Sequence, residues 1–233
     1  MEVERGAPSW GLGDAAAGWL IGVLATAIVG AVWAGASGNT KLSIGALSVA
    51  EVALWVGLAG APLWATRRKG TGDLGRDFGL RIQASDAVAV PVGIVSQLIL
   101  VPLIYLPIEW LSGHHDVSKP AKEIIGGAHG GGQLALLTAV LVIGAPVVEE
   151  LFFRGLVLRS IQRRLGASPR ADLWAVVGSA VVFGLSHFEL LQLPALIAFG
   201  LILGLLAVRS GRLGPGIWAH AAFNAVTVLL LAR

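Results

Sequence analysis

Long apolar runs are the feature that most limits what this chain can fold into. Several stretches of mostly apolar residues follow one another, with short polar segments between them. Each is close to the length of about twenty residues that a helix needs to cross a hydrocarbon core of about 30 Å. The sequence therefore predicts an all-α fold, a polytopic membrane helix bundle.

The overall composition supports this fold class. Hydrophobic residues make up 55% of the chain and charged residues only 13%, whereas soluble domains are about a quarter charged. The formal net charge of +3 comes from basic residues beside the apolar runs, which is typical of topology signals and not of a surface for nucleic acid. The absence of cysteine excludes disulfides, thiolate catalysis and cysteine-ligated metals. We expect one membrane-embedded domain over residues 1–233.

Seven spans are predicted, and residues 108–133 leave room for an eighth, short or re-entrant segment. The seven cover residues 15–36, 45–66, 86–107, 134–158, 172–188, 192–208 and 213–232. The acidic N-terminal segment and the length of the first run indicate a retained helix and not a cleaved signal peptide. In the sixth span, Gly200 and Gly204 form a small-xxx-small pair that predicts a close contact between two helices.

Lysine and arginine are distributed unevenly between the loops. The loops after the second, fourth and sixth spans hold eleven of these residues, and the alternate loops hold three. Since cytoplasmic loops carry the excess of positive charge, we expect the N-terminus in the cytoplasm and the C-terminus outside.

A few ionisable side chains fall inside the predicted spans, where a charge costs about 2.5–3.5 kcal/mol on insertion scales. Such groups usually face a bundle interior or a water-filled cavity. They are therefore the candidates for a functional site. The set is Glu51, Glu149, Glu150, Arg154, His187 and His220, with Asn224 as a polar neighbour.

The two adjacent glutamates have different surroundings on a helix. Glu150 and Arg154 are spaced i,i+4, so they lie on one face and are expected to form an ion pair. Glu149 is turned about 100° away and needs a partner from another helix, for which His187 is the candidate. A carboxylate in such a place is suited to general base catalysis. The alternative is that Glu150 and Arg154 form an ion pair that only joins helices, and that Glu149 lies at a hydrated edge of the bundle.

The later spans supply two histidines and an amide. His187 follows Phe183 by four residues and His220 precedes Asn224 by four, so each pair shares a helix face. Together with Glu149 they are the groups that activate a water molecule and stabilise an oxyanion. Buried acid and histidine chains also serve as proton relays. The alternative is thus a non-catalytic membrane protein that uses them as a relay, a helix-packing element or a peptide-binding scaffold.

Three motifs occur in order on successive apolar segments and resemble the signature of the CPBP family. They are EExxxR (Glu149, Glu150, Arg154), FxxxH (Phe183, His187) and HxxxN (His220, Asn224). The family includes the CAAX prenyl proteases (Ras-converting enzyme) and the Abi or bacteriocin-processing proteins. The resemblance covers about residues 134–232 and implies an intramembrane endopeptidase. It implies that Glu149 with His187 activates water, that His220 and Asn224 hold the oxyanion, and that Glu150 and Arg154 order the site.

The resemblance leaves the cofactor open. Zinc would have Glu149, His187 and His220 as candidate ligands, but HExxH is absent, and we favour metal-free glutamate chemistry. The loop with His114, His115, Asp116 and His129 is glycine-rich, and we interpret it as solvated.

The expected partners are the lipid bilayer and a membrane-associated protein or peptide substrate, with no nucleic acid. The sequence does not say whether that substrate is prenylated. We expect an integral protein of a bacterial cell membrane, with its active site facing the cytoplasm.

Overall fold

The computed structural model describes residues 8–113, 116–166 and 168–232, and no strand occurs among them. The fold is an all-α bundle, as predicted. Some of its rods contain 3-10 or π-helical segments, which carry η labels. The elements are α1 (Leu12–Ser37), α2 (Ile44–Lys69), α3 (Leu74–Asp77), η1 (Ala84–Ala89), α4 (Val90–Val95), η2 (Ser96–Leu100), α5 (Val101–Ser112), α6 (Lys119–Gly126), α7 (Gly131–Thr138), η3 (Ala139–Gly144), α8 (Ala145–Glu149), η4 (Glu150–Val157), α9 (Leu158–Leu165), α10 (Pro169–Leu185), α11 (Leu193–Ser210) and α12 (Gly214–Leu231).

Each predicted span corresponds to one helical rod. Within the described part of the chain, six rods are long and apolar enough to cross a membrane, namely α1, α2, Ala84–Leu111, Gly131–Leu165, α11 and α12. The fifth predicted span is α10, which has 17 residues and packs against α11. The connection of residues 108–133 contains one short extra helix, α6. His114 and His115 lie outside the described residues.

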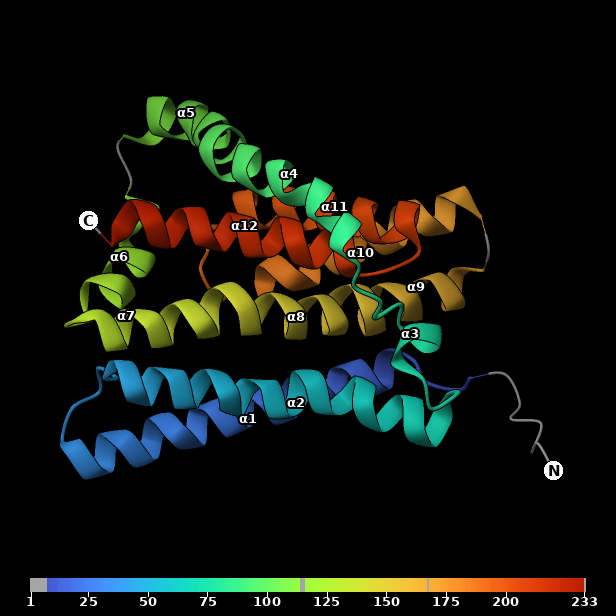
Figure 1. Cartoon of the computed structure of the whole chain (residues 1–233), viewed down its shortest axis with the longest axis horizontal. Helices are drawn as coiled ribbons and strands as arrows, with labels where there is room; N and C mark the ends of the chain where they lie inside the picture. Colours follow the sequence, from blue (N-terminus) through green and yellow to red (C-terminus); the bar gives the residue numbers. More distant parts are fainter. Residues whose placement is uncertain (1–7, 114–115, 167, 233) are drawn as a thin grey trace.

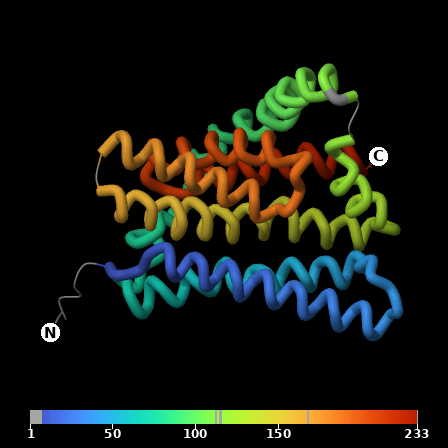
Figure 2. The backbone as a smooth tube through the Cα atoms, turned by 180° about the vertical axis from the view of Figure 1, so that it is seen from behind, coloured from blue at the N-terminus to red at the C-terminus, as the bar shows by residue number. Residues whose placement is uncertain are grey.

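The rods lie side by side in layers (Figure 1). The α1–α2 hairpin forms one edge, and the long rod from α7 to α9 lies next to it. Helices α10, α11 and α12 lie beyond this central rod, and α4 and α5 cross them obliquely. The view from behind shows the same order (Figure 2). The start of α1 and the end of α12 lie at opposite ends of the bundle, as expected for an odd number of crossings.

Prolines explain two π-helical segments. Segment η2 ends just before Pro102, and η3 ends just before Pro146. Because proline has no N–H, the ladder of backbone hydrogen bonds is interrupted there and the preceding turn widens. Segment η4 contains no proline, yet it is π-helical and includes Glu150 and Arg154. Such segments occur frequently at functional sites.

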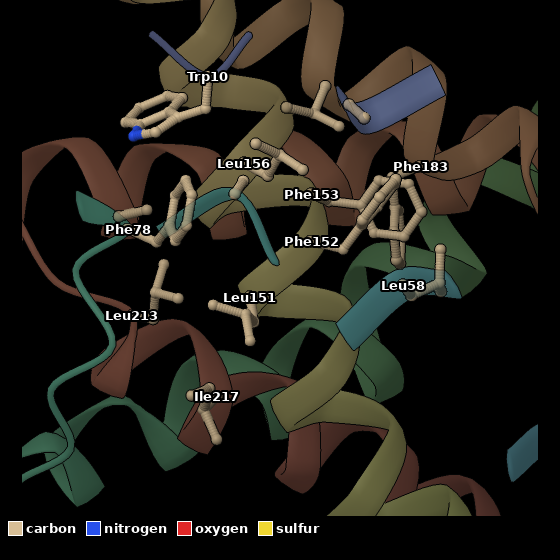
Figure 3. Packing of buried hydrophobic residues seen from close by; sticks show 14 residues of the cluster. Trp10, Leu58, Phe78, Leu151, Phe152, Phe153, Leu156, Phe183, Leu213 and Ile217 are labelled. Carbon is tan, nitrogen blue, oxygen red and sulfur yellow. The ribbon is translucent and has the colours of Figure 1, made fainter. Parts of the chain in front are cut away.

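The largest buried apolar cluster surrounds η4. Leu151, Phe152, Phe153 and Leu156 of this segment are at most 5% exposed. They pack against side chains from the hairpin, from α10 and from α12, as Figure 3 shows. Since lipid is as apolar as these side chains, helices in a membrane associate through close van der Waals contact. The cluster therefore holds the central rod between the hairpin and the C-terminal helices.

Glycines allow the helices to approach closely at two interfaces. A Cβ on Gly57 of α2 would clash with the backbone of Gly18 in α1. On α11, a Cβ at Gly200 would lie 3.0 Å from the Cα of Ala180 in α10, and Gly204 makes a similar contact one turn further on. The close helix contact predicted from this small-xxx-small pair is confirmed.

The outer faces of the bundle are apolar. Leu20, Leu24 and Ile28 of α1 are 53%, 61% and 63% exposed. A contiguous apolar face of this kind marks contact with a membrane or a partner. Together with the rod lengths, it identifies an integral membrane protein.

Candidate active site

The ion pair predicted within EExxxR is present and fully buried. Arg154 Nη1 lies 2.7 Å from Glu150 Oε1, and neither side chain is exposed. Arg154 Nη2 donates to the carbonyl of Gly200 on α11 at 3.1 Å, and the guanidinium lies 4.4 Å from the centre of the Phe183 ring on α10. The pair therefore ties η4 to two neighbouring helices. Gly216 makes room for it, because a Cβ there would lie 2.8 Å from Glu150 Oε2.

His220 of α12 lies between the two glutamates. Its Nδ1 is 3.2 Å from Glu150 Oε1, and its Nε2 is 3.9 Å from Glu149 Oε2. The ring is 4% exposed and packs edge-on against Phe183 and Phe199. A carboxylate accepts and does not donate, so Nδ1 carries the proton in its contact with Glu150. Glu150 thereby orients the imidazole, with Nε2 on the side of Glu149.

His187 lies just beyond the end of α10. Its Nδ1 is 2.8 Å from the backbone carbonyl of Phe183. Because a carbonyl only accepts, Nδ1 is protonated and Nε2 of the neutral ring keeps its lone pair. The Phe183 ring packs edge-on against both imidazoles, with centroids 4.7 Å from His187 and 5.8 Å from His220. Phe183 thus positions both histidines, although its motif indicated only its spacing to one.

Asn224 stabilises the central rod. Its Nδ2 donates to the carbonyl of Leu141 in η3 at 2.8 Å. In a π-helical turn the donor for this carbonyl would come from position 146, which is a proline without an N–H. A backbone carbonyl within a membrane needs a partner, and Asn224 supplies it. The second N–H of the same amide is left for another acceptor.

A cavity of about 570 Å³ lies beside these groups. Glu149, His187 and Asn224 line it, Glu150 and Arg154 are fully buried beside it, and His220 has its Nε2 on the side of Glu149. The wall is mostly apolar and is formed by α1, α2, η2, α5, α6, the central rod and residues near one end of α10, α11 and α12. An apolar cavity with a few convergent polar groups is the usual form of a ligand site.

The partner of Glu149 differs from the one expected. Among the described residues, the imidazole within ion-pair distance of Glu149 is that of His220 and not that of His187. His187 and Glu51 of α2 line the same cavity. The order of the helices around the central rod decides this pairing, and motif spacing carries no information on it. Glu51, which the sequence marks only as an ionisable group in a span, lines the cavity.

The cavity lies in one half of the bundle. It extends from Glu149 and Phe153, near the middle of the central rod, to α6 at one end. The arginine-rich loops lie at the opposite end, where α3 and the end of α9 are found (Figure 1). The cavity therefore lies in the half of the bundle away from these loops, and the predicted cytoplasmic N-terminus and cytoplasmic active site both stay predictions. If the arginine-rich loops are cytoplasmic, as expected from the charge count, the cavity lies in the outer half of the bundle.

The candidate zinc ligands do not converge on one point. In the described ranges, no group of three or more histidine, aspartate or glutamate side chains is arranged to hold a metal ion. One nitrogen of His220 faces Glu150, and one nitrogen of His187 is bonded to a backbone carbonyl. This arrangement does not fit a zinc site, and no step proposed below uses a metal.

The buried charges, the histidines and the cavity lie together within a helix bundle, and the segment that carries them matches one known family. Residues 131–226 match the family model described as type II CAAX prenyl endopeptidase, Rce1-like. This part of the chain is thus similar to Rce1-like domains, and the family resemblance of the three motifs is confirmed. The matched segment begins with α7 and contains all six predicted site residues. No curated protein and no solved structure matches the chain.

Proposed function

We propose that this chain is an intramembrane endopeptidase that uses a glutamate to activate water against a peptide bond of a membrane-associated protein or peptide. The observation that carries the proposal is the position of Glu149. Its Oε2 is buried and has no hydrogen-bond donor among the described residues, at the wall of the cavity and 3.9 Å from His220 Nε2. A carboxylate oxygen of this kind has a lone pair available for a water molecule.

In the proposed reaction, Glu149 takes a proton from water as the hydroxide adds to the peptide carbonyl. The oxygen that gains negative charge is stabilised by the free N–H of Asn224 and by Nε2–H of His220 in its protonated form. Glu149 then gives its proton to the leaving amine as the C–N bond breaks. Fixed donors aimed at a developing oxyanion are commonly the largest contribution to such catalysis.

His187 and Arg154 complete the assignment. Nε2 of His187 is a free acceptor at the cavity wall, suited to orient the water together with Glu149. Arg154 holds the Glu150 carboxylate, and through it the imidazole of His220. The six residues Glu149, Glu150, Arg154, His187, His220 and Asn224 therefore form one proposed catalytic unit.

The test is cleavage of labelled membrane-associated peptides by the full chain in lipid vesicles. Glu149→Gln keeps the size of the side chain and removes the base, so turnover should fall by at least about 100-fold while the melting temperature stays unchanged. Cleavage that persists in this variant would show that Glu149 is not the base.

The matched control is Glu150→Gln. Since Glu150 is fully buried and paired with Arg154, this variant should lose stability as well as activity. If no peptide in a broad panel is cleaved, but Glu149→Gln alters proton flux across the vesicle membrane, the groups form a proton relay and not a protease.

A further inference from the structure

Glu51 is a carboxylate of the active-site cavity that lies outside the segment matched by the family model. It belongs to α2, lines the same cavity as Glu149 and His187, and is partly buried. In the described part of the chain, no ion pair within 4.0 Å joins Glu51 to His187, and the cavity that both side chains line is the space for a bound group.

Trp55 holds Glu51 in place against the central rod. The indole Nε1 donates to Glu51 Oε1 at 3.1 Å. The same ring packs tightly on Gly144 of η3, where a Cβ would lie 2.9 Å from two ring carbons. Gly144 precedes Glu149 by five residues in the same rod. One side chain thus fixes the position of Glu51 relative to the proposed base.

The cavity wall carries acceptors and negative charge without a matching cation. Three carboxylates line it, those of Glu51, Glu149 and Glu189, and the described lining residues include no lysine or arginine. Gln97 of η2 also lines it, and its Oε1 is buried with no donor in the described structure. A carboxylate in an apolar membrane cavity is costly unless it is paired. Trp55 supplies one N–H to Glu51, and a cationic ligand would supply the positive charge that the described lining lacks.

We propose that Glu51 is a specificity-determining residue that binds a basic group of the substrate, an ammonium or a guanidinium carried next to an apolar segment. The apolar wall accommodates the apolar segment of the substrate. The cation has only hydrogen-bond donors, and Glu51 and Gln97 Oε1 accept its N–H groups. The inference rests on the proposed protease function for the identity of the substrate as a peptide. It does not depend on which residue activates water.

Synthetic peptides in vesicles of phosphatidylcholine and phosphatidylglycerol test this proposal. The peptides share one apolar segment and carry lysine, glutamine or glutamate at a single position, which is scanned along the sequence. The native chain should cleave the best lysine peptide about 10-fold more efficiently in kcat/KM than its glutamine counterpart, as expected for one partly desolvated charge pair. Glu51→Gln should abolish this preference, so that the lysine and glutamine peptides are cleaved with about equal kcat/KM. Glu51→Lys should favour the glutamate peptide.

Glu189→Gln is the matched control, because it removes an exposed carboxylate of the same cavity and should leave the lysine preference intact. An equal loss of kcat/KM for all three peptides in Glu51→Gln would overturn the proposal, since a merely structural residue would behave in that way.

Binding separates this inference from the proposed function. Fluorescence anisotropy of the labelled peptides on the Glu149→Gln protein should show the same lysine preference, and adding Glu51→Gln should remove it. If that holds although the native chain cleaves no peptide, Glu51 is confirmed as a binding residue and the protease proposal fails. If the Glu149→Gln protein binds the lysine and glutamine peptides equally, the proposal for Glu51 is wrong.

Discussion

Replacing Arg154 with methionine is the change whose energetic cost the structure specifies best. It keeps much of the length of the side chain but removes the charge. Glu150 Oε1 would then keep only its contact with His220 at 3.2 Å, and Gly200 would lose the donor to its carbonyl. Removing one partner of a buried ion pair leaves an uncompensated charge, which costs about 3–5 kcal/mol. We expect Arg154→Met to lower the free energy of unfolding by this amount.

A double-mutant cycle isolates the pair. Glu150→Gln leaves Arg154 with its contacts to Gly200 and Phe183, so its cost should be about 1.5–3 kcal/mol, as for a hydrogen bond to a charged group. The double variant contains neither charge. Its cost should therefore be smaller than the sum of the single costs by about 2 kcal/mol, within the range found for residues in contact.

Reversible unfolding in mixed detergent micelles, followed by tryptophan fluorescence and circular dichroism, measures these values. The control is Arg76→Met, because Arg76 forms a solvent-exposed pair with Asp73 at 3.8 Å; it should change stability by less than about 0.5 kcal/mol. Single costs that add within about 0.5 kcal/mol would refute the reasoning, since the two charges would then be uncoupled.

Further changes test the packing, the orientation and the chemistry. Asn224→Leu leaves the Leu141 carbonyl without its donor and should cost about 1–3 kcal/mol of stability, measured in the same micelles. Gly57→Leu should lower the melting temperature, because its side chain would clash with the backbone of α1. The chain contains no cysteine, so a single cysteine can be labelled cleanly in intact cells. An impermeant maleimide should reach Gly132→Cys and not Ser210→Cys, and the reverse result would invert the orientation. Chelators should leave peptide cleavage unchanged; inhibition that added zinc reverses would contradict the metal-free chemistry.

Features set by local spacing were predictable from the sequence. The spans follow from the length of the apolar runs, and the ion pair of Glu150 with Arg154 follows from their i,i+4 spacing. The contact of Gly200 with α10 follows in the same way from two glycines one helical turn apart. The spans, the ion pair and the glycine contact each depend on residues that are near one another in the sequence.

Features set by the arrangement of helices were not predictable. His220 and not His187 faces Glu149, because the packing of α12 against the central rod brings it there. Segment η4 is π-helical although it contains no proline, so its form could not be predicted from the sequence. The side on which the cavity lies depends on α6 and on the ends of three helices, which come together only in the folded bundle. Glu51 illustrates the same limit, because α2 meets the cavity through tertiary packing alone.

The walls of the cavity come from two parts of the chain. The proposed catalytic groups all lie within residues 131–226, whereas Glu51, Gln97, Tyr105 and the α6 residues belong to the segment that precedes them. Mutations in that earlier segment can change which substrates the cavity accepts without moving the proposed catalytic groups. Exchanging residues 8–126 between two chains that share the three motifs should therefore change what the cavity accepts and leave the proposed catalytic groups in place.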